Sequence, residues 1–221
     1  MGEKLIKTKS ICLVEGKDEI NFCKSLLEHL NIKDVCCVDI GGNRSFNIKF
    51  KTKILVDDGF KNIEKIAIIR DAETNIAQSA FDSIKSALSV QDERNKLKDI
   101  ISQCSLENNI VHNNNIKCGI FIMPNNKTQG MLEDLCLKYV EQLPVNICIS
   151  HFIDCLKQNV FCNKSIENIN ISKSKLLSYL ASLTTKKDNP TSLGIAALQG
   201  HFDFNNDVFK NITNFLKQVF L

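Results

Sequence analysis

The feature that most constrains the fold is a short apolar run at residues 11–14 that ends on an acid, Glu15, and turns at Gly16. Apolar residues then recur at helical spacing, at Ile20, Cys23, Leu26, Leu27 and Leu30. A strand, a tight turn and an amphipathic helix in this order form a βα unit. Open α/β sheets carry their chemistry at the carboxyl ends of such strands, so Glu15 is the first candidate site residue.

Three further apolar runs predict strands, and each is followed by a segment with helical spacing. The runs cover residues 35–40, 66–69 and 119–123, and the helical patterns cover residues 45–60, 76–88 and 130–140. Alternating strands and helices favour a parallel sheet with right-handed crossovers. We therefore predict an α/β fold with a Rossmann-like four-stranded parallel sheet flanked by helices. The Asn-rich residues 108–115 are interpreted as a surface loop.

The chain beyond Pro144 has a mostly helical pattern. Apolar stripes at helical spacing run over residues 147–160, 173–183 and 206–220, and no Gly-, Ser- or Pro-rich linker precedes them. Stripes of this kind need a partner surface. We expect an α/β domain over residues 1–144 and a helical C-terminal extension over residues 145–221 that packs on it.

The composition excludes several classes of protein. With 43% hydrophobic and 24% charged residues and no apolar stretch of membrane-spanning length, the chain is typical of a soluble globular protein. The N-terminus has no apolar segment of signal-peptide length, which favours a cytoplasmic location. Ten cysteines without a C-x-x-C spacing fit buried free thiols better than a zinc site. Cys36 and Cys37 are adjacent on a predicted strand and are expected on opposite faces.

A second acidic strand end strengthens the case for a site. Asp71 and Glu73 follow the apolar run at residues 66–69, so they are expected at the same sheet edge as Glu15. Taken alone, Glu15 is equally consistent with ordinary turn chemistry. Three carboxylates together supply the hard oxygen ligands that Mg²⁺ prefers, and their mutual repulsion requires a cation between them. Arg70 either pairs with these acids or contacts a phosphate group.

Several segments resemble known motifs. The segment Val14-Glu15-Gly16-Lys17-Asp18 is similar to the first motif of Toprim domains, and Asp71-Ala72-Glu73 resembles the second, which is normally Asp-x-Asp. Toprim domains occur in topoisomerases and in overcoming-lysogenization-defect (OLD) nucleases. Other segments resemble a small prokaryotic family of unknown function related to the OLD nucleases, namely residues 39–42, 123–125, 130–135 and 201–204. The resemblance implies a Toprim-like fold for the sheet.

The resemblance also implies roles for individual residues. Glu15 takes the place of the Toprim glutamate that acts as a general acid or base, and the second motif takes the place of the acids that hold magnesium. The OLD nucleases add two further acids, which correspond to Glu19 and Glu133. The implied ligands of Mg²⁺ or Mn²⁺ are Glu15, Glu19, Asp71, Glu73 and Glu133.

Two positions depart from the motifs. Glu73 stands where Asp is usual, which keeps the charge, and Met131 stands where Ser is usual, which removes one oxygen donor. We expect a Mg²⁺- or Mn²⁺-dependent hydrolase of nucleic-acid phosphodiesters, with nucleic acid as its partner and no membrane contact. Lys127 either neutralises a developing charge or is solvated. The alternatives are a Mg²⁺-dependent phosphatase or nucleotidyl transferase, and a non-catalytic adaptor.

Overall fold

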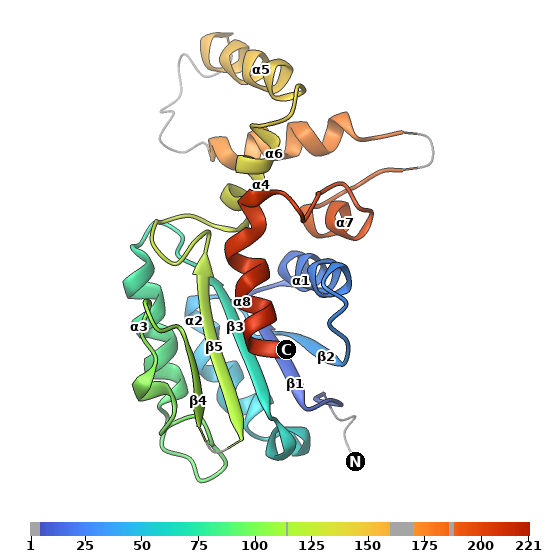
Figure 1. The fold of residues 1–221 in the computed structure, drawn as a ribbon. Helices are drawn as coiled ribbons and strands as arrows, with labels where there is room; N and C mark the ends of the chain where they lie inside the picture. Colours follow the sequence, from blue (N-terminus) through green and yellow to red (C-terminus); the bar gives the residue numbers. More distant parts are fainter. Residues whose placement is uncertain (1–4, 114, 160–169, 186–187) are drawn as a thin grey trace.

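A computed structural model describes residues 5–113, 115–159, 170–185 and 188–221 (Figure 1). Its centre is a five-stranded sheet in the order β2-β1-β3-β5-β4. The strands are β1 (Ser10–Val14), β2 (Val35–Asp39), β3 (Lys65–Asp71), β4 (Ile110–Asn113) and β5 (Ile116–Met123). The strands β2, β1, β3 and β5 are parallel, which confirms the predicted α/β fold and its four parallel strands.

The fifth strand corrects the prediction of a four-stranded sheet. Strand β4 lies in the Asn-rich segment interpreted as a loop, and it pairs antiparallel with β5, with Ile110 opposite Gly119. In this four-residue edge strand Val111 alone is buried, so the strand lacks the continuous apolar run that marks the inner strands. Asn109 extends the pairing because its side-chain Nδ2 donates to the carbonyl of Ile120 at 2.9 Å.

The described part of the chain forms eight α-helices. They are α1 (Lys17–His29), α2 (Asn43–Lys49), α3 (Ala77–Leu88), α4 (Leu132–Val140), α5 (Asn146–Asn159), α6 (Ile171–Ser182), α7 (Leu193–Leu198) and α8 (Lys210–Phe220). Four short turns of other helix types also occur: η1 (Phe50–Ile54), η2 (Asp58–Asn62), η3 (Ile101–Gln103) and η5 (Asp207–Phe209). The single helix predicted over residues 45–60 is therefore three segments, α2, η1 and η2. Residue 160, the last of the predicted stripe over 147–160, lies outside the described residues.

Two hydrophobic cores cover the two faces of the sheet. Cys12 and Val14 of β1 pack into one core with residues of α1, α4 and α8, whereas Ile11 and Leu13 pack into the other with residues of α2 and α3. Successive strand residues point to opposite faces, so a strand covered on both sides needs apolar side chains at every position. This explains why residues 11–14 form an unbroken apolar run.

The last helices of the chain return to the sheet and to the first helix. Helix α8 lies against β3 and β5, and α7 lies against α1 (Figure 1). Gly119 of β5 leaves room for α8, since a Cβ there would lie 2.6 Å from Val219. The Asp18 carboxylate accepts hydrogen bonds from the Ser192 hydroxyl and the Gly194 amide and so fixes α7 at the start of α1.

The other two C-terminal helices lie further from the sheet. Helix α6 contacts α4 and α5, and it also touches α7. None of the helices in the described ranges combines the length and apolar character needed to cross a lipid bilayer.

Candidate functional site

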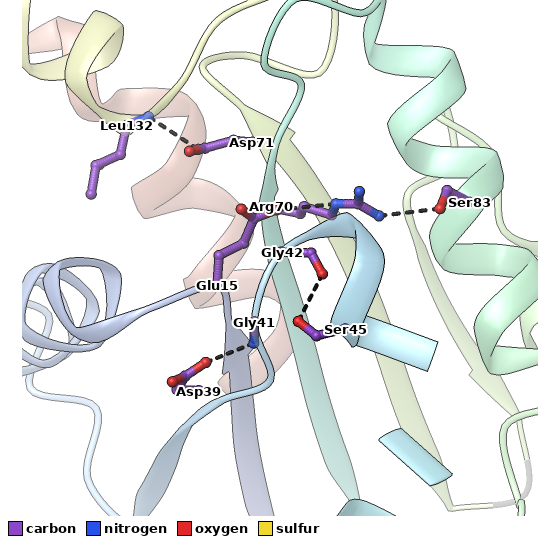
Figure 2. A network of polar contacts seen from close by, with 9 residues as sticks. All are labelled: Glu15, Asp39, Gly41, Gly42, Ser45, Arg70, Asp71, Ser83 and Leu132. Atoms are coloured by element: carbon purple, nitrogen blue, oxygen red, sulfur yellow. Dashed lines mark hydrogen bonds and ion pairs between the residues drawn. The ribbon is translucent and has the colours of Figure 1, made fainter. Parts of the chain in front are cut away.

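Glu15 follows β1 and forms an ion pair with Arg70 of the neighbouring strand β3. The Arg70 Nε lies 3.1 Å from Glu15 Oε1, and the two side chains are only 4% and 14% exposed (Figure 2). A second arm of the guanidinium donates to Ser83 of α3 at 3.3 Å. Burial raises the pKa of Glu15, Arg70 partly offsets this, and the nearby Glu73 and Glu19 raise it further.

Asp71 ends β3 and points to the opposite face of the sheet from Arg70, toward the start of α4 (Figure 2). Its Oδ1 accepts a hydrogen bond from the Leu132 amide at 3.1 Å, and the residue is 8% exposed. Burial raises the pKa of Asp71 well above its ordinary value, and Glu15, Glu19 and Glu133 raise it further. The Leu132 amide lowers it and is the weaker influence.

Glu19 and Glu133 lie in the first turns of α1 and α4, and both are partly buried. Burial raises the pKa of Glu19, and Glu133, Asp18 and Asp39 add to this rise, so these charges lie near one another. The acid next to Glu133, Asp134, accepts a hydrogen bond from the Met131 amide at 2.8 Å and serves as a helix cap. Of the two acids in the first turn of α4, Glu133 is therefore the one whose charge raises the pKa of Asp71 and of Glu19.

Glu73 joins the end of β3 to the loop before α4 through its backbone. Its amide donates to the Gly130 carbonyl at 3.0 Å, and the Gly130 amide donates to the Glu73 carbonyl at 2.9 Å. Glu73 has a φ of +56°, a backbone angle that is unfavourable for residues other than glycine. The side chain is exposed, and its charge contributes to the raised pKa of Glu15. Glu73 therefore positions α4 with its backbone and adds charge with its carboxylate.

A glycine loop after β2 completes this edge, with one acid to which sequence analysis assigned no role. Asp39 ends β2, and its Oδ1 accepts a hydrogen bond from the Gly41 amide at 2.6 Å (Figure 2). The same oxygen lies 3.3 Å from the Lys49 ammonium. A Cβ on Gly42 would lie 3.3 Å from Glu15 Oε2, so the loop passes directly beside Glu15. The sequence pattern that could have identified Asp39 as a site residue is an acid at the end of a predicted strand, followed closely by Gly41 and Gly42.

The structure places Lys127 apart from the acids. Lys127 lies in the loop between β5 and α4, where its amide donates to Asn125 Oδ1. It lines a groove of about 490 Å³ against Asn211 and Asn214 of α8, and none of the five predicted acids lines that groove. The cation beside Glu15 is Arg70, for which sequence analysis left pairing with the acids or phosphate contact open.

The donor set of this edge has the chemistry that Mg²⁺ prefers, although it is not a closed cage. Among the described residues, no three His, Cys, Asp or Glu side chains are arranged to hold a metal ion. Magnesium is commonly bound by one or two carboxylates together with waters and substrate phosphate, so a closed cage is not required. Asp71, Glu19 and Glu133 repel one another, and a divalent cation would relieve that repulsion. The residues present therefore fit an open magnesium site.

The fold and this edge together define a class of protein. It is a mixed α/β protein with a mainly parallel sheet and a group of acids at the carboxyl ends of its inner strands. The sequence profile of the family described as "Protein of unknown function (DUF3226)" matches residues 9–221, and the chain belongs to that family. No curated protein matches the chain.

Solved structures with a similar fold include C-terminal regions of OLD proteins. The C-terminal region of the Burkholderia pseudomallei OLD protein is 15% identical, with a TM-score of 0.49 over 97% of this chain and 99% of that chain. The C-terminal region of the Xanthomonas campestris pv. campestris OLD protein is 13% identical, with a TM-score of 0.44 over 96% of each chain. Because both TM-scores are below 0.5, this similarity indicates nothing about the roles of individual residues or about chemistry.

Proposed function

We propose that this protein is a Mg²⁺- or Mn²⁺-dependent hydrolase of nucleic-acid phosphodiesters. The observation that carries the proposal is the gathering of acids at one sheet edge, where burial and the charges of Glu15, Glu19 and Glu133 raise the pKa of the Asp71 carboxyl group. Desolvated groups with perturbed pKa values concentrate at functional sites. A structural role alone offers no reason to gather like charges, because each costs stability when ionised.

The acids divide by environment into two proposed roles. Asp71, Glu19 and Glu133 supply oxygen ligands, with Glu73 as an exposed fourth candidate. A bound divalent ion would supply positive charge against the phosphate oxygens. Glu15 also belongs to the ligand set, and its raised pKa brings it closer to the range in which a carboxyl group transfers protons near neutral pH.

Two cations complete the proposal. Arg70 holds the Glu15 carboxylate in a single orientation, because one arm of the guanidinium binds Glu15 and another binds Ser83. A fixed orientation is needed for efficient proton transfer. Lys127, in the loop after β5, keeps the role expected from the sequence, which is to neutralise a charge that develops on the substrate.

The choice of a nucleic acid as substrate rests on the resemblance of the two acidic motifs to Toprim domains. The same acids would serve a phosphatase or a nucleotidyl transferase, since both also transfer a phosphoryl group. Two observations favour a non-catalytic adaptor. Glu15 is already paired with Arg70, and Met131 supplies no oxygen ligand where the OLD motif has serine.

A plasmid-nicking assay tests the proposal. Wild-type protein should convert supercoiled DNA to the nicked form in MgCl₂ or MnCl₂ but not in EDTA. Glu15→Gln should reduce the rate by a factor of roughly 100 to 10,000, because it removes a proton-transfer group. Asp71→Asn should also reduce it and should raise the Mg²⁺ concentration needed for half-maximal rate. Glu93→Gln, an exposed acid outside the site, is the matched control.

The outcomes separate the alternatives. Equal nicking by wild type and Glu15→Gln after the same purification would show that the activity comes from another site or a contaminant. Release of inorganic phosphate from nucleotides without nicking would favour the phosphatase. Absence of both activities together with absence of metal binding would favour the adaptor.

A further inference from the structure

Three cysteine thiols meet in the core between the first helix and the sheet edge. Cys12 lies on β1, Cys23 on α1 and Cys37 on β2, and we refer to them as the thiol trio. Cys12 is the central member, because the thiols of both Cys23 and Cys37 act on it and raise its pKa. All three are free thiols, and they contribute to one hydrophobic core or its margin.

Cys12 and Cys37 are also direct partners in the strand register. They face each other across the parallel pair β1–β2, so their side chains lie on the same face of the sheet. Neighbouring strands lie about 4.7–4.9 Å apart. This spacing falls within the range of about 4.4–6.8 Å that separates the Cα atoms of disulfide-bonded cysteines.

The trio has one member that solvent can reach. Cys12 and Cys23 are fully buried, whereas Cys37 is partly exposed because β2 is the edge strand. The neighbouring Cys12 thiol lowers the pKa of the Cys37 thiol, burial opposes this, and the charge of Lys24 on α1 lowers it further. A thiolate is the nucleophilic form of cysteine, and nearby cations favour it.

Cys36 provides an internal comparison for Cys37. It is adjacent on the same strand and similarly exposed, but it faces the other side, where its thiol lies 3.5 Å from the Leu5 carbonyl. Burial raises the pKa of Cys36, and its register partner on β1 is Ile11. Cys36 therefore lacks both features of Cys37, a neighbouring thiol that lowers its pKa and a register partner that can form a disulfide.

We propose that Cys37 is a peroxide-reactive modification site and that Cys12 is its resolving thiol, so that oxidation links β1 to β2 by a disulfide. The proposal is independent of the metal chemistry at the acidic edge. The oxidant is a peroxide, either hydrogen peroxide or an organic hydroperoxide. Reduction by a small dithiol restores both thiols.

The reaction has two balanced steps. In the first, the Cys37 thiolate attacks one peroxide oxygen, the O–O bond breaks, and the departing hydroxide takes up a proton to form water. The product is the Cys37 sulfenic acid. In the second, the Cys12 sulfur attacks the Cys37 sulfur, the S–O bond breaks, and the hydroxyl leaves with the Cys12 proton as water. Two thiols lose two electrons in total, and one hydrogen peroxide becomes two waters.

Peptide mapping of the full-length protein tests the proposal. The reduced protein is treated with hydrogen peroxide, its remaining thiols are alkylated with N-ethylmaleimide, and it is digested without reduction. Mass spectrometry should find the peptides of Cys12 and Cys37 joined and lighter by two hydrogens, with Cys36 alkylated. This result needs no variant, so it does not depend on how a substituted core folds.

Variants then assign the two roles. Cys37→Ser should slow the first peroxide-dependent loss of a thiol by on the order of tenfold, and the matched control Cys36→Ser should leave it unchanged. In Cys12→Ala, dimedone should trap the Cys37 sulfenic acid, because the resolving thiol is missing. The proposal is overturned if Cys36 is oxidised as fast as Cys37. It is also overturned if Cys37 links only to Cys36 or to another molecule, or if no Cys12–Cys37 link forms.

Discussion

Two ion pairs lie at the opposite ends of the neighbouring strands β1 and β3. At the amino end, Lys9 lies 2.5 Å from Glu64, and the two side chains are 68% and 49% exposed. At the carboxyl end, Glu15 and Arg70 are 3.1 Å apart and almost buried. The shorter pair is therefore the one in water, where its charges are well solvated and weakly coupled.

The comparison shows that distance is a poor guide to the importance of an ion pair. Burial raises the pKa of Glu15 and of Asp71, and the acids around them add to that effect. At the amino end, solvent screens both charges. Desolvation thus makes the carboxyl end sensitive to every charge placed there, including a bound cation.

The largest expected effect comes from removing the buried cation. Arg70→Met should lower the free energy of unfolding by about 3 kcal/mol or more, because it leaves Glu15 buried and unpaired. Lys9→Met, the matched control at the amino end, should cost about 1 kcal/mol or less. Urea denaturation of both variants measures the difference. The double variant with Arg70→Met and Glu15→Gln should recover part of the loss, and equal effects of Arg70→Met and Lys9→Met would contradict the comparison.

The second-largest expected effect is stabilisation by Mg²⁺, which should depend on residues at the carboxyl end of the sheet and not on those at the amino end. With free Mg²⁺ at 100 times its dissociation constant, a site present only in the folded protein stabilises it by about 2.7 kcal/mol. We expect a rise in Tm with MgCl₂ relative to NaCl of the same ionic strength. The rise should be smaller in Asp71→Asn and unchanged in Lys9→Met. An undiminished rise in Asp71→Asn would exclude Asp71 as a ligand.

Asp71→Asn should stabilise the metal-free protein near pH 8 by about 1 kcal/mol, or about 2–4 °C in Tm. The pKa of Asp71 is raised on folding, so its ionisation at high pH disfavours the folded state. Wild type regains this stability as the pH falls through the folded pKa, fully so below the unfolded value of about 3.9. The advantage of the variant should therefore disappear in acid. A Tm difference that does not vary with pH would contradict this origin.

The smallest expected effect is that of salt on stability. Salt should weaken the exposed ion pair at the amino end and leave the buried pair largely unchanged. Raising NaCl from low concentration to about 1 M shortens the Debye length to about 3 Å. The small destabilisation caused by Lys9→Met should then vanish, whereas that caused by Arg70→Met should largely remain. Thermal unfolding at both salt concentrations measures this. Loss of the Arg70→Met effect in salt would mean that solvent reaches the buried pair.

Much of the fold could be predicted because each inner strand carries its own signal. Residues 11–14 and 66–69 are apolar at every position, since both faces of the sheet are covered, and this local pattern predicts a buried parallel strand. Parallel strands place their carboxyl ends together, so the grouping of Glu15 with Asp71 followed from chain order. Strand β4 was missed because an exposed edge strand is stabilised by its partner β5 rather than by its own apolar residues.

The order of strands and helices and the acids at the strand ends can be read from the amino-acid pattern alone. Which charges are desolvated is a property of the folded protein, because burial depends on every element packed around a residue. Arg70 pairs with Glu15 and lies away from the Asp71 side because consecutive strand residues face opposite ways. Cys12 meets Cys37 for the same kind of reason: strand register joins residues that are distant in the chain, and local sequence carries no signal for it.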